Sequence, residues 1–234
     1  MPKRLIIAST STLHRSDYLA YLLPTLEVLY QNANTIVFIP YARPGGISHE
    51  QYTDIAAKAF KKIGKKIIGL HTYKNPVEAI ENAEGIFTGG GNTFVLVNQL
   101  YKTEVLPVLR KKIFEGTPYL GTSAGSNICG LTMQTTNDMP IAYPPSFKTL
   151  GALPFNINPH YLDPIAGSTH MGETRETRIK EFHAHNHIPV IGLREGSWLE
   201  VLDNAITLRG TPTARVFEKD KVPYEITSGS LLDF

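Results

Sequence analysis

The chain has 234 residues, of which 42% are hydrophobic and 19% charged, and its formal net charge is +2. This near balance of charge argues against nucleic acid as a partner, and a single cysteine, Cys129, excludes an internal disulfide framework or a cysteine-rich metal site. The apolar stretch near the N-terminus is too short for a signal peptide and no run reaches membrane-spanning length, so we expect a cytoplasmic protein.

Six short apolar runs rich in β-branched residues are typical of buried parallel strands. In chain order they cover residues 5–9, 35–42, 66–73, 85–90, 119–123 and 189–193. Helical patterns lie between them, over residues 47–64, 75–84 and 93–116. Alternating strands and helices predict a three-layer α/β fold, in which a mostly parallel sheet has helices on both faces.

Two of the predicted helices carry local signals for where they begin, end or bend. Ser48 and Gln51 form a capping-box pattern at the start of the first helix, and Gly64 stands at its end. The helical region over 93–116 contains Pro107. Proline lacks a backbone N–H and its ring clashes with the preceding turn, so we expect Pro107 to break or kink this helix.

The C-terminal part has a different pattern. Residues 197–220 alternate between apolar and polar side chains around turn residues, which predicts an antiparallel hairpin that closes the sheet. Residues 137–172 are irregular and rich in proline, asparagine and glycine, and long loops of this kind are often functional. Because no internal repeat or linker is apparent, we expect a single domain over residues 1–234.

Residues 121–125, Gly-Thr-Ser-Ala-Gly, fit the Gly-x-Ser-x-Gly nucleophile elbow. The pattern lies where the elbow requires it, with a predicted strand before Ser123 and a helical segment after it. A helix N-terminus at this point favours developing negative charge on the serine. The alternative is a glycine-serine turn in which Ser123 or Ser126 only caps a helix.

A reactive serine needs a base, and the base needs an acid that orients it. His160 stands in INPHYLDP, within the irregular region, where a loop can aim its ring. Glu195 follows the apolar strand at 189–193, and the end of a core strand would hold a carboxylate rigidly. The plainer alternatives are a surface histidine and an exposed turn carboxylate.

Glycines 89–91 and Asn92 form a second glycine-rich turn at the end of a predicted strand. The turn lacks the spacing of a dinucleotide fingerprint and the lysine of a phosphate-binding P-loop. It could instead present backbone N–H groups to an oxyanion, as the glycine-rich turn of esterases does. The N–H groups of Gly91 and Ala124 would then complete an acyl-transfer site around Ser123.

Six segments carry a resemblance to a known family. They are FTGGGNTF, YLGTSAGSNICG, MQTTNDMPI, FNINPHYLD, GETRETRI and GLREGSWL, in this order between residues 87 and 199. Together they resemble the serine peptidase family that includes peptidase E, an alpha-aspartyl dipeptidase, and cyanophycinase. The resemblance implies a flavodoxin-like fold similar to that of class I glutamine amidotransferases, with serine in the place of their cysteine.

The resemblance also implies roles for single residues. The family's nucleophile falls on Ser123, its base on His160 and its acid on Glu195. Its oxyanion donors fall on Gly91 and Ala124. No metal or organic cofactor is implied, and the expected partner is a small peptide bound by a monomer or a homodimer.

The family's substrate is a dipeptide with an N-terminal aspartate, whose carboxylate needs a cationic partner. Arg175 and Arg178 lie one helical turn apart, and the resemblance favours Arg175, while Arg178 is expected to pair with a neighbouring glutamate. Asp138 is either a competing acid or a ligand of the substrate's amino group, and Asn92 is expected at the substrate. Three alternatives remain: a cyanophycinase-like hydrolase, an amidotransferase-like hydrolase, and a non-catalytic small-molecule binding module.

Overall fold

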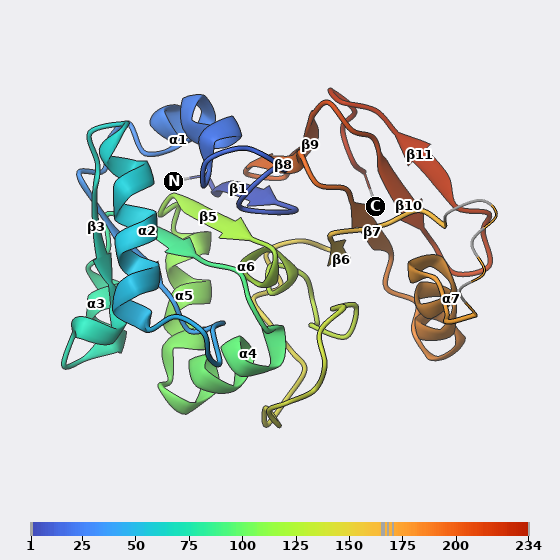
Figure 1. Cartoon of the computed structure of the whole chain (residues 1–234), viewed down its shortest axis with the longest axis horizontal. Coiled ribbons are helices and arrows are strands. Elements are labelled where there is room, and N and C mark those ends of the chain that lie inside the picture. The colour runs from blue at the N-terminus through green and yellow to red at the C-terminus, as the bar shows by residue number, and fades with distance from the viewer. Residues whose placement is uncertain (1, 165–166, 168, 170, 234) are drawn as a thin grey trace.

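The structure is a computed structural model that describes residues 2–164, 167, 169 and 171–233. Its framework is a pair of β-sheets (Figure 1). The larger sheet consists of β1 (Arg4–Ala8), β2 (Thr35–Ile39), β3 (Lys66–Gly69), β4 (Gly85–Thr88), β5 (Tyr119–Thr122), β8 (Ser197–Leu202) and β9 (Ala205–Gly210). Across the sheet their order is β3-β2-β4-β5-β1-β8-β9. The first five of these are mutually parallel, and β8 and β9 add an antiparallel hairpin beside β1.

Helices cover both faces of the larger sheet, as the alternating pattern predicted. One face packs against α3 (Pro76–Glu81), α4 (Thr93–Lys102) and α5 (Val105–Phe114), and the other against α1 (Leu23–Leu29) and α2 (His49–Lys61). Strand side chains alternate between the two cores, so that Ile7 and Val37 meet the first group of helices, and Ile6 and Phe38 the second. Two short 3-10 helices, Ala20–Leu22 and Leu70–Thr72, and the single-turn α6 (Ala124–Asn127) complete this part.

The smaller sheet lies beyond the hairpin and is formed by the C-terminal third of the chain. It consists of β6 (Asn156–Pro159), β7 (Val190–Leu193), β10 (Ala214–Phe217) and β11 (Tyr224–Ile226), in the order β11-β10-β7-β6. The helix α7 (Arg175–His185) lies beside it (Figure 1). The predicted strand at 189–193 is therefore a strand, but it belongs to this second sheet. The predicted hairpin at 197–220 holds for β8 and β9, whereas β10 pairs with β7.

Strand β6 was not predicted, because it contains Asn156 and Asn158 where an apolar strand would carry aliphatic side chains. Both amides bind the loop that covers the strand. The Asn156 Oδ1 atom accepts from the Thr132 amide at 2.9 Å, and the Asn158 Nδ2 atom donates to the Thr135 carbonyl at 2.8 Å. These buried asparagines thus satisfy backbone groups of a segment that has no regular structure.

The prediction for Pro107 was wrong about the position of the break. The helical region divides at Glu104, which has a φ of 57°, and Pro107 lies inside the first turn of α5. The N–H groups of a first helical turn have no intrahelical partner, so proline costs little there. The capping box was predicted correctly: the Ser48 hydroxyl accepts from the Gln51 amide, and the Gln51 side chain accepts from the Ser48 amide.

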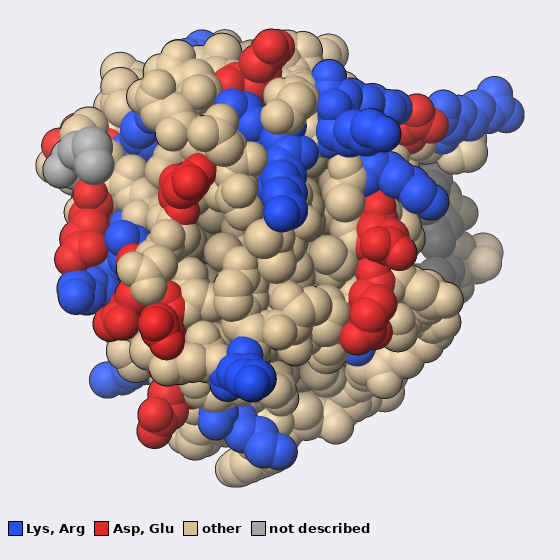
Figure 2. Space-filling model, turned by 90° about the vertical axis from the view of Figure 1, so that its left-hand side faces the viewer, with Lys and Arg blue, Asp and Glu red and all other residues tan. Residues whose placement is uncertain are grey.

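Charges of both signs are interspersed over the face that carries α2 and α3. Figure 2 shows this face, on which acidic side chains lie among lysines and arginines, and neither sign dominates it. The distribution agrees with the net charge of +2. Among the described residues, no helix has the length and apolar character needed to cross a membrane.

Candidate active site

The elbow sequence forms a sharp turn between β5 and α6, with Ser123 at its apex. Ser123 has φ 53° and ψ −110°, angles that a residue with a side chain adopts only under local strain. Its amide donates to the Ala8 carbonyl of β1 at 3.1 Å, which ties the turn to the centre of the sheet. The Ser123 side chain makes no capping bond to α6, so the capped-turn alternative does not describe it.

Ser123 is the first member of a row of three hydrogen-bonded side chains. The distance from its Oγ to the His160 Nε2 is 2.8 Å, and from the His160 Nδ1 to the Glu195 Oε1 it is 2.6 Å. With the proton on Nδ1, the imidazole donates to the carboxylate and accepts from the serine hydroxyl. The three side chains come from the ends of β5, β6 and β7, so both sheets contribute to the row.

Ser9, at the carboxyl end of β1, holds two parts of this row together. Its buried hydroxyl accepts from the His160 amide at 2.9 Å and donates to the Leu193 carbonyl at 2.6 Å, two residues before Glu195. His160 itself has a φ of 52°, so this contact supports an unusual backbone conformation. Ser9 was not predicted as a site residue, although a polar residue at the end of the strand predicted over 5–9 was a usable signal.

The glycine-rich turn after β4 approaches the serine closely. A Cβ on Gly90 would lie 2.9 Å from the Ser123 Cβ, and one on Gly91, where φ is 143°, would collide with the Ala42 carbonyl. Only glycine therefore fits at either position. Among the described residues no acceptor binds the N–H of Gly91 or of Ala124, the first residue of α6. Both groups are available to an oxyanion next to Ser123.

Asp138 lies at the start of α4 and does not contact His160. Its Oδ2 atom accepts from the Thr93 amide and hydroxyl, both at 2.7 Å, and from the Thr136 hydroxyl at 2.9 Å. Glu195, and not Asp138, therefore occupies the position of the acid beside the histidine. Asn92 caps α4, because its Oδ1 accepts from the Val95 amide at 3.1 Å.

Arg175, the first residue of α7, is a partly buried cation without an ion pair in the described part of the chain. Burial lowers the pKa of its guanidinium, the neighbouring Arg178 lowers it further, and Asp138 opposes both effects. The cation therefore lies within electrostatic reach of Asp138. Arg178 is exposed and faces Glu173 at 3.9 Å, as expected for a residue on the solvated side of the helix.

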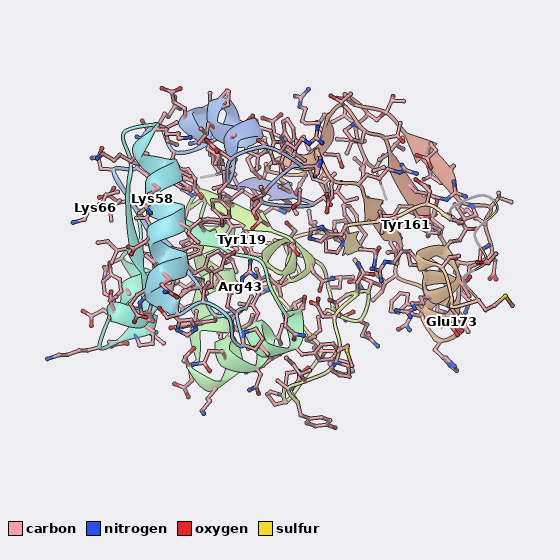
Figure 3. The ribbon with its side chains drawn as sticks, in the orientation of Figure 1. Arg43, Lys58, Lys66, Tyr119, Tyr161 and Glu173 are labelled. Atoms are coloured by element: carbon pink, nitrogen blue, oxygen red, sulfur yellow. The ribbon has the colours of Figure 1, made fainter. Side chains whose placement is uncertain are left out.

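Arg194 joins the segment after His160 to the smaller sheet. Its guanidinium forms two hydrogen bonds with the Asp163 carboxylate, at 2.7 and 2.8 Å, and binds Glu225 of β11 at 2.8 Å. It also lies over the ring of Tyr161, 5.4 Å from the centroid; Figure 3 labels Tyr161. Arg194 precedes Glu195 directly, so this network fixes the backbone on both sides of the histidine–carboxylate contact.

We expect acid to remove the stabilisation that Glu225 provides. Hydrogen bonding to Arg194 lowers the pKa of Glu225 from an ordinary value of 4.5 to about 2. A carboxylate with a lowered folded-state pKa stabilises the fold above pH 4.5, and this contribution is lost as the pH falls towards 2. Because the group is partly exposed and screened, Glu225→Gln should cost only about 1 kcal/mol at pH 7, or a few degrees in the unfolding midpoint. Thermal unfolding of both proteins should show this difference narrowing as the pH falls, and a difference that persists at pH 2 would contradict the assignment.

Comparison with known proteins relates this geometry to a family. The model of peptidase family S51 matches residues 5–209. A Drosophila melanogaster protein named probable alpha-aspartyl dipeptidase is 45% identical over 221 residues, which are 93% of this chain and 91% of that protein. Peptidase E of Streptomyces coelicolor is 44% identical over 226 residues, covering 97% of this chain and 92% of its own.

Solved structures show the same fold at low sequence identity. A crystal structure of a peptidase from an acI-B1 Actinobacterium aligns with a TM-score of 0.76 at 16% identity, over 100% of this chain and 98% of the other. A crystal structure described as a peptidase E protein from Listeria monocytogenes aligns with a TM-score of 0.68 at 19% identity, over 91% of this chain and 100% of the other. The family match and the full-length relatives together establish that the chain belongs to peptidase family S51.

Proposed function

We propose that the protein is a serine dipeptidase that hydrolyses dipeptides of the form Asp-Xaa through an acyl-enzyme on Ser123. The observation that carries this proposal is the row of hydrogen bonds from Ser123 through His160 to Glu195, at 2.8 and 2.6 Å. This arrangement provides a nucleophile, a general base and an orienting acid within bonding distance of one another. The relatives named alpha-aspartyl dipeptidase and peptidase E support the substrate class.

In the first step the Ser123 hydroxyl attacks the scissile carbonyl carbon while the His160 Nε2 takes its proton. The carbonyl oxygen becomes an oxyanion, which the N–H groups of Gly91 and Ala124 stabilise. One such donor commonly contributes about 3 kcal/mol to lowering the barrier. Glu195 holds the proton on Nδ1, so that Nε2 is the basic nitrogen, and it stabilises the imidazolium that forms.

In the second step the imidazolium protonates the leaving amine, the C–N bond breaks, and Ser123 carries an aspartyl ester. Water then enters, and His160 takes its proton as the hydroxide attacks the ester carbon. Collapse of this intermediate returns the proton to the serine oxygen and releases free aspartate. Both half-reactions use one base and one oxyanion site, so the row of three side chains needs no rearrangement between them.

Recognition of the N-terminal aspartate is assigned to Arg175 and Asp138. A partly buried guanidinium that pairs with no described carboxylate suits the β-carboxylate of the substrate, which it can bind through two parallel hydrogen bonds. The Oδ2 atom of Asp138 is occupied by Thr93 and Thr136, but no described residue binds Oδ1. This second oxygen is available to the free amino group of the substrate.

Substrate comparison tests this assignment. We expect the wild-type protein to hydrolyse Asp-Leu much faster than Asn-Leu, because the amide cannot form the ion pair with Arg175. Arg175→Ala should lower kcat/KM for Asp-Leu by about 100-fold and change Asn-Leu little, since removing one partner of a buried charge pair costs several kcal/mol. The matched control is Arg178→Ala, which removes a cation from the exposed side of the same helix. If Arg175→Ala keeps the wild-type preference for Asp-Leu, Arg175 does not bind the β-carboxylate.

A further inference from the structure

Arg43 is a cation in the loop between β2 and α2. Its guanidinium packs over the ring of Tyr52, with 4.9 Å between the guanidinium carbon and the ring centroid. No ion pair to Arg43 is formed by the residues that the structure describes. An arginine on an aromatic face is held in place and less strongly hydrated than a free one, and both effects favour binding of an anion.

The platform under Arg43 is joined to the elbow. Tyr52 is buried, and its hydroxyl donates to the Gly90 carbonyl at 3.2 Å. Gly90 in turn abuts Ser123, with no room for a side chain between them. The residue before Arg43, Ala42, accepts from the Asn92 amide at 2.7 Å. The backbone and the ring that position Arg43 are therefore both fixed to the glycine-rich turn beside the nucleophile.

Arg43 is an exposed residue, and its guanidinium lies close to Tyr18 as well as to Tyr52. Figure 3 places Arg43 between α2 and α6. Burial raises the pKa of the neighbouring Tyr18 well above 10, and the Arg43 cation opposes this rise. The Tyr18 hydroxyl is buried and has no hydrogen-bond partner among the described residues. It belongs to the loop that follows Ser9, so Arg43 lies between that loop and α2, at the border of the site.

Arg43 and Arg175 lie on opposite sides of the serine. Arg43 precedes α2 and Arg175 begins α7, and these helices stand on either side of α6 (Figure 1). A dipeptide has a free carboxylate three bonds beyond its scissile carbonyl carbon, at a distance of about 4 Å. If Arg175 binds the aspartate side chain, the leaving residue extends towards Arg43.

We propose that Arg43 binds the C-terminal carboxylate of the dipeptide. This inference rests on the proposed function and adds the recognition of the leaving residue to it. A free carboxylate at this position distinguishes a dipeptide from a longer peptide or a peptide amide. Arg43 thus makes the enzyme selective for substrates that end one residue after the aspartate.

The test compares Asp-Leu with aspartyl-leucinamide, which differs only in the absence of the terminal charge. The wild-type protein should favour Asp-Leu in kcat/KM. Arg43→Gln should lower kcat/KM for Asp-Leu by about 10- to 100-fold and leave the amide within twofold, because only the charged substrate loses a partner. Arg110→Gln is the matched control. Arg110 lies in α5, which precedes β5, and its guanidinium packs over the ring of Phe114 in the same way, 4.6 Å from the centroid. It should leave both rates unchanged.

The outcomes separate this inference from the proposed function. If the wild-type protein hydrolyses both substrates equally and Arg43→Gln changes neither, Arg43 does not bind the carboxylate, and the dipeptidase assignment stands. An equal loss on both substrates would also overturn the inference, because it would reflect damage to the glycine-rich turn. If the wild-type protein hydrolyses neither aspartyl substrate, the proposed function fails and the inference fails with it.

Discussion

Ser123→Ala is expected to lower turnover of Asp-Leu by about 10⁴- to 10⁶-fold, the range seen when a nucleophile of this kind is removed. The proposal gives Ser123 the bond-forming role, and no neighbouring group replaces its oxygen. The fold should be unaffected, because the Ser123 side chain makes no capping bond and, among the described residues, bonds only to the His160 ring. Single-turnover and steady-state assays would measure the loss, and thermal unfolding would show that the variant is folded.

Ser126→Ala provides a contrast within the same turn. The Ser126 hydroxyl is buried and donates to the Ala8 carbonyl at 2.6 Å, so its removal should cost about 1 kcal/mol of stability. Activity at low temperature should remain. A serine-reactive phosphonate should label wild type and Ser126→Ala but not Ser123→Ala. Unimpaired hydrolysis by Ser123→Ala would end the serine-peptidase proposal.

Glu195→Gln should have the next largest effect, a loss of about 10³- to 10⁴-fold in kcat. A glutamine can donate to the His160 Nδ1, which places the imidazole proton on Nε2. A protonated Nε2 cannot accept the proton of the Ser123 hydroxyl. It also lacks the charge that stabilises the imidazolium. The expected loss is smaller than that for Ser123, because the nucleophile and the oxyanion donors remain.

The control for this change is Glu200→Gln, which makes the same substitution in the adjacent strand β8. Glu200 pairs with Arg209 at 2.7 Å and has no contact with the row of three side chains. Its replacement should leave kcat within twofold. If Glu195→Gln retains more than a tenth of wild-type kcat, the orientation of His160 depends on Ser9 and its backbone, and the role of Glu195 is secondary.

Several features of the site could be predicted because they depend on neighbours in the sequence. The elbow requires a strand, a glycine two residues before and two residues after Ser123, and a helical start, and all three stand within residues 119–127. The capping box at Ser48 depends on a residue three positions further on. The glycine-rich turn was recognisable in the same way, because a backbone that packs closely against any other group needs glycine.

Other features depend on contacts between distant segments, and sequence pattern alone did not predict them. Strand β6 has asparagines, which bind a covering loop, at positions where a buried strand usually has aliphatic residues. Its sequence therefore resembled that of a loop. Asp138 could be read from the sequence as an acid for the base or as a ligand for an amine, and only the structure shows that it binds Thr93 and Thr136 instead of His160. The pairing of β10 with β7, instead of with its neighbour in the sequence β9, likewise depended on how the two sheets are arranged.

The sequence by itself determined the chemistry that is available: a serine on an elbow, a histidine and a glutamate further along the chain, and a glycine turn for an oxyanion. The tertiary structure decided the distances, because only the meeting of the two sheets brings His160 within 2.8 Å of Ser123 and 2.6 Å of Glu195. It also decided which charges lack a partner. Arg43 and Arg175 are ordinary arginines in the sequence, and an unpaired cation becomes recognisable only when the positions of all described carboxylates around it are known.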